Sequence, residues 1–250
     1  MYPYTSLWGI ELPTYGLLVT LGAGLCCLCA YRRIKQLQLS VNSFLIIAAL
    51  AIGCAMIGAK VLYIFLTFSP SQIISFLSKG SYQEMLQGGF VFYGGLLFGL
   101  LGAVFGAKLA EVALLSYEQA IVPFLPLAYG IGRLGCFFAG CCYGFPYNGP
   151  LAVTYPHSSC PRFPVQLLDA VFSILSFLFL LAFSQKTRKK GTLLLIYLLV
   201  YAIQRFFLEF LRGDEIRGAS CNLSTSQWIS MGIFLFCICL FLFRRKTHRP

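Results

Sequence analysis

Seven apolar stretches, each long enough or nearly long enough to cross a bilayer, constrain this chain more than any other feature. The hydrocarbon core needs roughly 20 apolar residues of helix, and a helix satisfies its own backbone hydrogen bonds in lipid. The stretches lie at Thr14–Tyr31, Phe44–Phe68, Gly89–Leu109, Ala120–Phe138, Pro164–Phe183, Thr192–Leu211 and Ser226–Phe243. The sequence therefore predicts an all-α integral membrane protein with seven transmembrane helices and one membrane domain over residues 1–250.

The composition supports this class. Hydrophobic residues make up 58% of the chain and charged residues only 11%, against about 25% charged in a soluble domain. The formal net charge of +11 could suggest a nucleic-acid partner, but the basic residues lie beside apolar runs instead of on a polar surface. We therefore expect the charge to report membrane topology, with no nucleic-acid partner.

The basic clusters predict the orientation. They follow the first, third, fifth and seventh stretches at residues 32–35, 108, 186–190 and 244–249. Basic loops stay on the cytoplasmic side, so the N-terminus is expected outside and the C-terminus inside. The external loops are then 69–88, 139–163 and 212–225. Residues 1–13 lack a basic start, so no cleavable signal peptide is expected.

The segment Gly130–Gly144 concentrates unusual chemistry at the end of the fourth stretch. It combines Arg133 with several glycines and with Cys136, Cys141 and Cys142. A guanidinium near hydrocarbon is costly and matches phosphate geometry with a bidentate fork. This pattern indicates a site for a phosphate-bearing lipid beside a group of thiols.

Ionisable residues within the apolar stretches are candidates for function by default. They are Lys60, Arg133, Asp169, Arg205 and Glu209. Arg205 and Glu209 are spaced i, i+4 and are expected to pair. With Tyr201 and Arg212 they predict a polar line along one helix face, although a structural ion pair explains the same spacing. The excess positive charge calls for an anion, which a lipid phosphate or Asp169 would supply.

The eleven cysteines divide by their depth in the membrane. Those inside the apolar stretches, at positions 26, 27, 29, 54, 237 and 239, are expected to be packing residues. Those near the external face are Cys136, Cys141, Cys142, Cys160 and Cys221, and Cys160 could bridge to Cys221 or Cys142. Zinc fits the spacing poorly, since His157 is the only nearby imidazole and no second spaced pair accompanies Cys141-Cys142. We expect neither a metal nor a cofactor.

These segments resemble the prolipoprotein diacylglyceryl transferase family over nearly the whole chain. Residues 132–144 resemble its signature G-R-x-G-N-F-x-N-x-E-x-x-G, and residues 201–212 resemble its Y-x-x-x-R-F-x-x-E-F-x-R. Shorter matches, in the same order as in the family, occur at residues 14–17, 58–63, 88–96, 163–170 and 223–228.

The resemblance implies a transferase of the bacterial inner membrane, with several spans and a site facing the periplasm. Such an enzyme moves the diacylglyceryl group of phosphatidylglycerol to the lipobox cysteine of a prolipoprotein. The resemblance places Arg133 and Arg205 as a clamp on the leaving phosphate, with Tyr93, Cys136 and Cys141 at the other catalytic positions. The substrate-binding positions that it implies are Tyr15, Gly94, Gly95, Gly132, Gly135, Gly144, Tyr201, Glu209 and Arg212.

Three of these positions depart from the family pattern. Tyr93 stands where the family has histidine, Cys136 where it has asparagine, and Cys141 where it has glutamate. Free tyrosine titrates near about 10 and free cysteine near about 8.5, so neither is a ready base at neutral pH. A neighbouring arginine could yield a thiolate that acts as base or nucleophile.

Alternatives to lipobox transfer therefore stay open. One is a divergent paralogue that transfers a lipid group to another acceptor. Another is a membrane thiol-redox protein that uses Cys136, Cys141 and Cys142. A transporter or a catalytically silent lipid-binding paralogue is the third.

Overall fold

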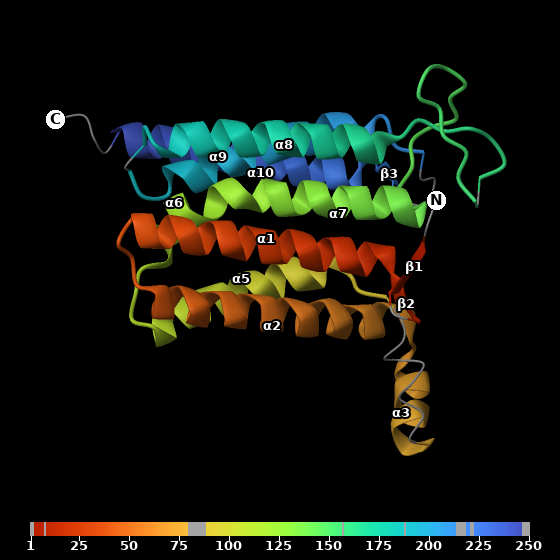
Figure 1. Cartoon of the computed structure of the whole chain (residues 1–250), viewed down its shortest axis with the longest axis horizontal. Helices are drawn as coiled ribbons and strands as arrows, with labels where there is room; N and C mark the ends of the chain where they lie inside the picture. Colours follow the sequence, from red (N-terminus) through yellow and green to blue (C-terminus); the bar gives the residue numbers. More distant parts are fainter. Residues whose placement is uncertain are drawn as a thin grey trace. The chain divides into compact units, whose positions relative to one another are not determined.

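The chain is mostly helical and forms two compact units in the computed structural model (Figure 1). The structure describes residues 3–7, 9–79, 89–156, 158–187, 189–213, 219–220 and 223–246. Unit 1 comprises residues 1–32 and 118–250, and unit 2 comprises residues 33–117.

The elements follow the apolar stretches closely. Those of unit 1 are β1 (Tyr4–Leu7), β2 (Ile10–Pro13), most of α1 (Thr14–Gln36), α6 (Glu118–Ile121), η2 (Val122–Phe124), α7 (Leu125–Ala139), α8 (Val165–Ser184), α9 (Thr192–Glu209), β3 (Ala219–Ser220), β4 (Leu223–Ser224) and α10 (Thr225–Lys246). Those of unit 2 are the end of α1, α2 (Val41–Thr67), α3 (Pro70–Lys79), α5 (Phe92–Leu109) and η1 (Leu114–Tyr117).

Six helical segments among the described residues are long and apolar enough to cross a membrane. They are Thr14–Gln36, Val41–Thr67, Leu114–Ala139, Val165–Ser184, Thr192–Glu209 and Thr225–Arg244. The remaining predicted stretch coincides with α5, whose apolar part Tyr93–Leu109 is shorter. The prediction of a helical, multi-pass membrane protein is confirmed, while the seventh crossing and the orientation stay predictions.

The N-terminal hairpin and α3 were not expected from the apolar pattern. The chain begins with an antiparallel hairpin of β1 and β2, in which Tyr4 pairs with Pro13. The predicted external loop 69–88 begins with α3, and its residues 80–88 lie outside the described part. Ser69 and Gln72 form a reciprocal capping box at the start of α3, since each side chain accepts a hydrogen bond from the other's backbone N–H. That local signal explains the helix.

Small residues let the helices of unit 1 approach closely. A Cβ on Gly135 of α7 would lie 3.3 Å from both Tyr15 and Leu18 of α1, and one on Gly130 would lie 3.1 Å from Ser173 of α8. Figure 1 shows α7 and α8 running side by side. Gly130 and Gly135 therefore serve helix packing.

A buried carboxylate fixes one end of α9. Glu118 is 5% exposed, and its two oxygens accept hydrogen bonds from the backbone N–H groups of Gly191 (2.6 Å) and Leu194 (3.3 Å). These are first-turn donors that have no partner within a helix, and a negative charge suits this end of the helix dipole.

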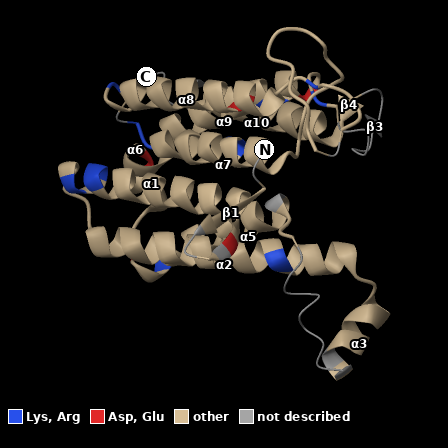
Figure 2. Cartoon of the chain, turned by 45° about the vertical axis from the view of Figure 1, so that its right-hand side comes forward, with Lys and Arg blue, Asp and Glu red and all other residues tan. Residues whose placement is uncertain are grey.

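The basic clusters after α8 and at the end of α10 meet at this end of unit 1, because Arg244 Nη1 donates to the Lys190 carbonyl at 3.2 Å. Figure 2 shows that Lys and Arg gather mainly near helix ends. Two of the clusters on which the orientation rests therefore lie together.

Unit 2 is built on the contact between α2 and α5. Gly94 of α5 packs on the Gly58 carbonyl of α2, and a Cβ on Gly94 would also lie 2.8 Å from the Leu62 side chain. A Cβ on Gly102 would lie 2.8 Å from the Cys54 side chain. The glycine-rich third stretch thus packs backbone against backbone, as its composition predicts.

We expect Gly58→Ala to destabilise unit 2. The added Cβ would collide with Phe98 and would lie 2.7 Å from the Gly94 carbonyl oxygen. Such overpacking costs about 1–3 kcal/mol. Gly53→Ala is the matched control, because nothing lies within 4 Å of its added Cβ. Thermal unfolding in detergent should give a lower midpoint for Gly58→Ala only, and equal midpoints would contradict this packing.

Candidate functional site

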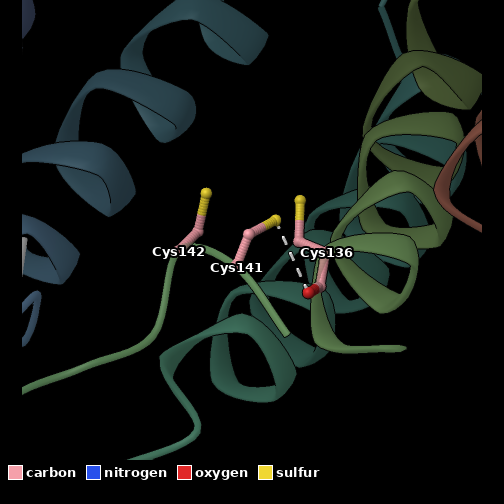
Figure 3. Close-up of side chains that lie close together, drawn as sticks. All are labelled: Cys136, Cys141 and Cys142. Carbon is pink, nitrogen blue, oxygen red and sulfur yellow. Dashed lines mark hydrogen bonds between the residues drawn. The ribbon is translucent and has the colours of Figure 1, made fainter. Parts of the chain in front are cut away.

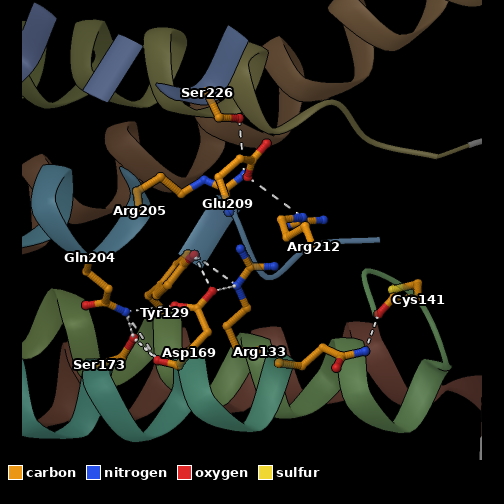
Figure 4. Close-up of polar contacts among 11 residues, drawn as sticks. Tyr129, Arg133, Cys141, Asp169, Ser173, Gln204, Arg205, Glu209, Arg212 and Ser226 are labelled. Carbon is orange, nitrogen blue, oxygen red and sulfur yellow. Dashed lines mark hydrogen bonds and ion pairs between the residues drawn. The ribbon is translucent and has the colours of Figure 1, made fainter. Parts of the chain in front are cut away.

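A buried ion pair between α7 and α8 forms the centre of the site (Figure 4). Arg133 Nε lies 2.6 Å from Asp169 Oδ2, and the Asp169 side chain is only 6% exposed. Tyr129, one turn before Arg133, donates its hydroxyl to the same carboxylate oxygen at 3.0 Å. Asp169 therefore supplies the counter-ion for Arg133, one of the two sources that the sequence left open.

The other Asp169 oxygen ties α9 to this pair. Gln204 Nε2 donates to Asp169 Oδ1 at 2.7 Å and to Ser173 Oγ at 3.2 Å. Ser173 in turn donates to the Asp169 carbonyl at 2.7 Å. The carboxylate is thus fully engaged, which holds Arg133 in one orientation.

A second cluster lies on α9. Arg205 Nη2 is 2.6 Å from Glu209 Oε2 and donates to Ser226 Oγ at 3.1 Å, so the predicted i, i+4 pair is confirmed. Arg212 Nε lies 3.9 Å from the same carboxylate oxygen. The expectation that Arg212 continues the helical stripe is wrong. α9 ends at Glu209, and Arg212 lies in an extended bridge opposite Gly144.

The two clusters present cationic groups for an anion. Arg205 is 9% exposed, and among the described residues its Nη1 atom is buried without a hydrogen-bond partner. Arg133 makes its contacts with Asp169 and Tyr129 through Nε, and Figure 4 shows its two Nη nitrogens directed away from Asp169. A buried guanidinium donor without a partner is costly, and a phosphate oxygen would satisfy it.

Backbone hydrogen bonds hold the segment after α7 to the chain before α8 and to the chain after α9. Gly144 N donates to the Phe163 carbonyl at 2.9 Å, and Phe145 N donates to the Leu211 carbonyl at 3.1 Å. A Cβ on Gly144 would lie 2.7 Å from both of those carbonyl oxygens. Only glycine allows the backbone segments to come this close, and this explains why the motif has a glycine at position 144.

Three sulfurs gather where α7 ends (Figure 3). The Sγ atoms of Cys136, Cys141 and Cys142 all lie within 4.8 Å of one another. Gly140, at φ +73°, ends the helix, and Cys141 N donates to the Cys136 carbonyl at 3.1 Å. This helix ending places Cys141, the residue after the glycine, next to Cys136 in the last helical turn. The sequence predicted a group of thiols here, and the helix ending at Gly140 explains how the three sulfurs come together.

The cluster has an uneven charge. Hydrogen bonds from Cys136 and Cys141 lower the pKa of the Cys142 thiol well below its usual range, and the Arg212 and Arg133 guanidiniums act in the same direction. Hydrogen bonds with Cys136 and Cys142 raise the pKa of the Cys141 thiol. Deprotonation is therefore easier at Cys142 than at Cys141.

Gln166 is a residue that sequence reasoning left without a role. It is 1% exposed, donates Nε2 to the Cys141 carbonyl at 2.7 Å, and accepts the Tyr155 hydroxyl at 3.0 Å. Its signal was a glutamine two residues after Pro164, at the start of α8. Gln166 fixes the backbone that carries the sulfur cluster.

Other predicted residues lie around these clusters or in unit 2. In unit 1, Tyr15 and Gly135 are in contact range, Gly132 faces Val19 of α1, and Tyr201 packs edge-to-face on Tyr129 at 5.7 Å. Tyr93, Gly94, Gly95 and Lys60 belong to unit 2. There Tyr93 is 48% exposed in the first turn of α5, and the Lys60 ammonium lies 5.1 Å from the Tyr63 and Phe90 rings.

The predicted Cys160–Cys142 disulfide is absent among the described residues, and the Cys160–Cys221 pairing is not tested. Cys160 and Cys142 are both free thiols in the structure, as are the other described cysteines. Cys221 and His157 lie outside the described residues.

Fold and site together define a multi-pass membrane protein whose buried arginines lie beside a thiol cluster. The sequence model of the prolipoprotein diacylglyceryl transferase family matches residues 4–243. A phosphatidylglycerol–prolipoprotein diacylglyceryl transferase of Clostridium tetani is 33% identical over 92% of this chain and 94% of its own length. Phosphatidylglycerol–prolipoprotein diacylglyceryl transferase 2 of Clostridium perfringens is 32% identical over 98% of this chain and 95% of its own length. The corresponding enzyme of Finegoldia magna is 31% identical over 92% of this chain and 90% of its own length. The chain belongs to the prolipoprotein diacylglyceryl transferase family.

We expect Asp169→Leu to destabilise the protein by about 3–5 kcal/mol, because it leaves Arg133 buried without its carboxylate. The double variant Arg133→Met/Asp169→Leu should regain much of that loss, since both charges are then gone. Glu11→Leu, at an exposed carboxylate, is the control. Unfolding in detergent micelles measures all three. If the double variant is no more stable than Asp169→Leu, the loss of stability does not come from the unpaired charge of Arg133.

Proposed function

We propose that this protein transfers the diacylglyceryl group of phosphatidylglycerol to the cysteine thiol of a prolipoprotein. The observation that carries the proposal is the pair of buried arginine clusters, at the positions where the family resemblance places its phosphate clamp. Family membership over residues 4–243 and the names of the relatives support the same reaction.

The arginines suit the leaving group. In this reaction the acceptor sulfur attacks a glycerol carbon, and negative charge develops on the departing phosphate oxygen. Donors that are already in place stabilise such charge without reorganisation. Arg205 Nη1 and the Arg133 Nη nitrogens are the donors, while Asp169 and Glu209 hold the two guanidiniums in position.

An apolar groove beside the arginines suits the acyl chains of the donor. It lies on α8 and α9, encloses about 700 Å³, and has mainly apolar lining residues such as Phe172, Phe179 and Phe207. Gln204 also lines it and donates to Asp169, the partner of Arg133. Because the groove adjoins the polar network, one lipid can place its chains in the groove and its phosphate near the arginines.

We propose further that the chain crosses the inner membrane seven times, with the N-terminus and the site on the periplasmic side. The tight contact of α5 with α2 supports α5 as a crossing helix, and the meeting of Lys190 with Arg244 supports a common cytoplasmic end.

Transfer should depend on Arg133 and Arg205. With phosphatidylglycerol labelled in its diacylglyceryl part and a lipobox peptide, Arg133→Gln and Arg205→Gln should each lower the rate by about 10²–10³, as expected for losing a charge-stabilising donor. Arg244→Gln is the control, because Arg244 is exposed and, among the described residues, its side chain donates to the Lys190 carbonyl. No label on the peptide with the unaltered protein, or equal loss in all three variants, would refute the proposal.

Reporter fusions should test the orientation. A phosphatase that is active only in the periplasm should be active when fused after Asn148, and inactive after Lys190 or after Pro250. A cytoplasmic reporter should give the opposite pattern. Activity of the phosphatase after Pro250 would mean an even number of crossings or the reverse orientation.

A further inference from the structure

The sulfur cluster at the end of α7, formed by Cys136, Cys141 and Cys142, is arranged as a set of metal ligands would be. Cys136 is buried, Cys142 half-buried and Cys141 exposed, so the cluster is anchored on one side and accessible on the other. Cys142 adopts φ +60°, a left-handed conformation that costs a non-glycine residue energy. In Figure 3 the three sulfurs gather on one side of the chain. A strained backbone that brings a third sulfur into the group indicates that the grouping has a use.

The spacing of the sulfurs fits one soft metal ion. Zinc binds thiolate sulfur at about 2.3 Å, so three thiolates around a tetrahedral ion lie about 3.8 Å apart. The three Sγ atoms here already lie within 4.8 Å of one another. Closing on an ion requires side-chain shifts of under about 1 Å, which rotation about the Cα–Cβ bonds can supply.

The surroundings hold the ligands in place. Gln166 fixes the Cys141 carbonyl, and Tyr155 fixes Gln166. Such outer contacts orient the ligands of metal sites. Two thiols in this set stand where the family pattern has asparagine and glutamate, while tyrosine replaces its histidine at Tyr93. At position 141 a sulfur ligand therefore stands in place of the carboxylate of the family pattern.

We infer that Cys136, Cys141 and Cys142 bind one zinc ion as three thiolates, and that the open fourth position takes the acceptor cysteine. Three protein ligands with an open position are the pattern of catalytic zinc sites. The inference rests on the proposed function, because it assigns the activation of the acceptor in that same reaction.

The acceptor sulfur bound to zinc is the nucleophile of the proposed transfer. The acceptor S–H binds zinc and releases its proton to solvent, since a coordinating thiol is deprotonated outright. A lone pair of the bound sulfur then forms the C–S bond to the glycerol carbon. The carbon–oxygen bond breaks, and its electron pair leaves on the oxygen of glycerol 1-phosphate. The product thioether is neutral and a weaker ligand than a thiolate, so it leaves the ion and frees the position.

Metal content of the untagged full-length protein in detergent tests the site directly. We expect about one zinc per chain by mass spectrometry, and a sulfur-to-metal charge-transfer band when Co²⁺ replaces it. Cys136→Ser, Cys141→Ser and Cys142→Ser should each weaken binding at least about tenfold. Cys239→Ser, at an exposed position on α10, should bind as the unaltered protein does. Since the unaltered protein is measured first, the result does not depend on the variants folding.

Transfer assays on the same preparations separate the inference from the proposed function. We expect a chelator to abolish transfer to the lipobox peptide and zinc to restore it. Full transfer by metal-free protein would overturn the inference and leave the proposed function standing. A protein that binds no metal and carries a Cys136–Cys141 disulfide would also overturn it. Stoichiometric zinc with no transfer under any condition would overturn the proposed function, and with it the acceptor's role at the ion.

Discussion

The ion pair between Arg133 and Asp169 is the interaction on which the rest of the site depends. Neither charge would be tolerated alone in an apolar bundle, where breaking a buried pair costs about 3–5 kcal/mol. The pair therefore fixes how α7 and α8 face each other, and Gln204 extends the same carboxylate to α9. Because the carboxylate contacts Nε, it holds the guanidinium without occupying the nitrogens that a phosphate would use.

A second constraint is the way α7 ends. Gly140 stops the helix one residue before two adjacent cysteines, and the resulting turn returns the chain to the last helical turn. The sulfur cluster is thus a product of helix-capping geometry, with Cys142 accepting a left-handed backbone to complete it. Arg133 and the sulfurs are carried by the same helix and its ending, which keeps this guanidinium close to the thiols.

Much of this could be predicted from sequence, and the failures have physical causes. Hydropathy located every apolar helix because backbone hydrogen bonding in lipid leaves few alternatives. The i, i+4 rule found the Arg205–Glu209 pair, because residues four apart are neighbours on one face of a regular helix. It failed at Arg212, since helix periodicity cannot see that α9 ends at Glu209 and that a backbone bridge to Gly144 takes over. The sequence also grouped Cys136 with Cys141 and Cys142, but it could not give the distances between their sulfurs, because the turn that returns the chain to the end of α7 depends on the backbone conformation at Gly140.

The capping of α9 at both of its ends limits how this helix can move. Glu118 holds the first-turn N–H groups, and the bridge from Gly144 holds the chain that follows the last turn. Sliding the helix along its axis would break both sets of hydrogen bonds at once. Tilting or sideways displacement would stretch them far less. If a lipid binds at Arg205 as we propose, its exchange would therefore favour lateral opening between helices over movement of α9 along its axis.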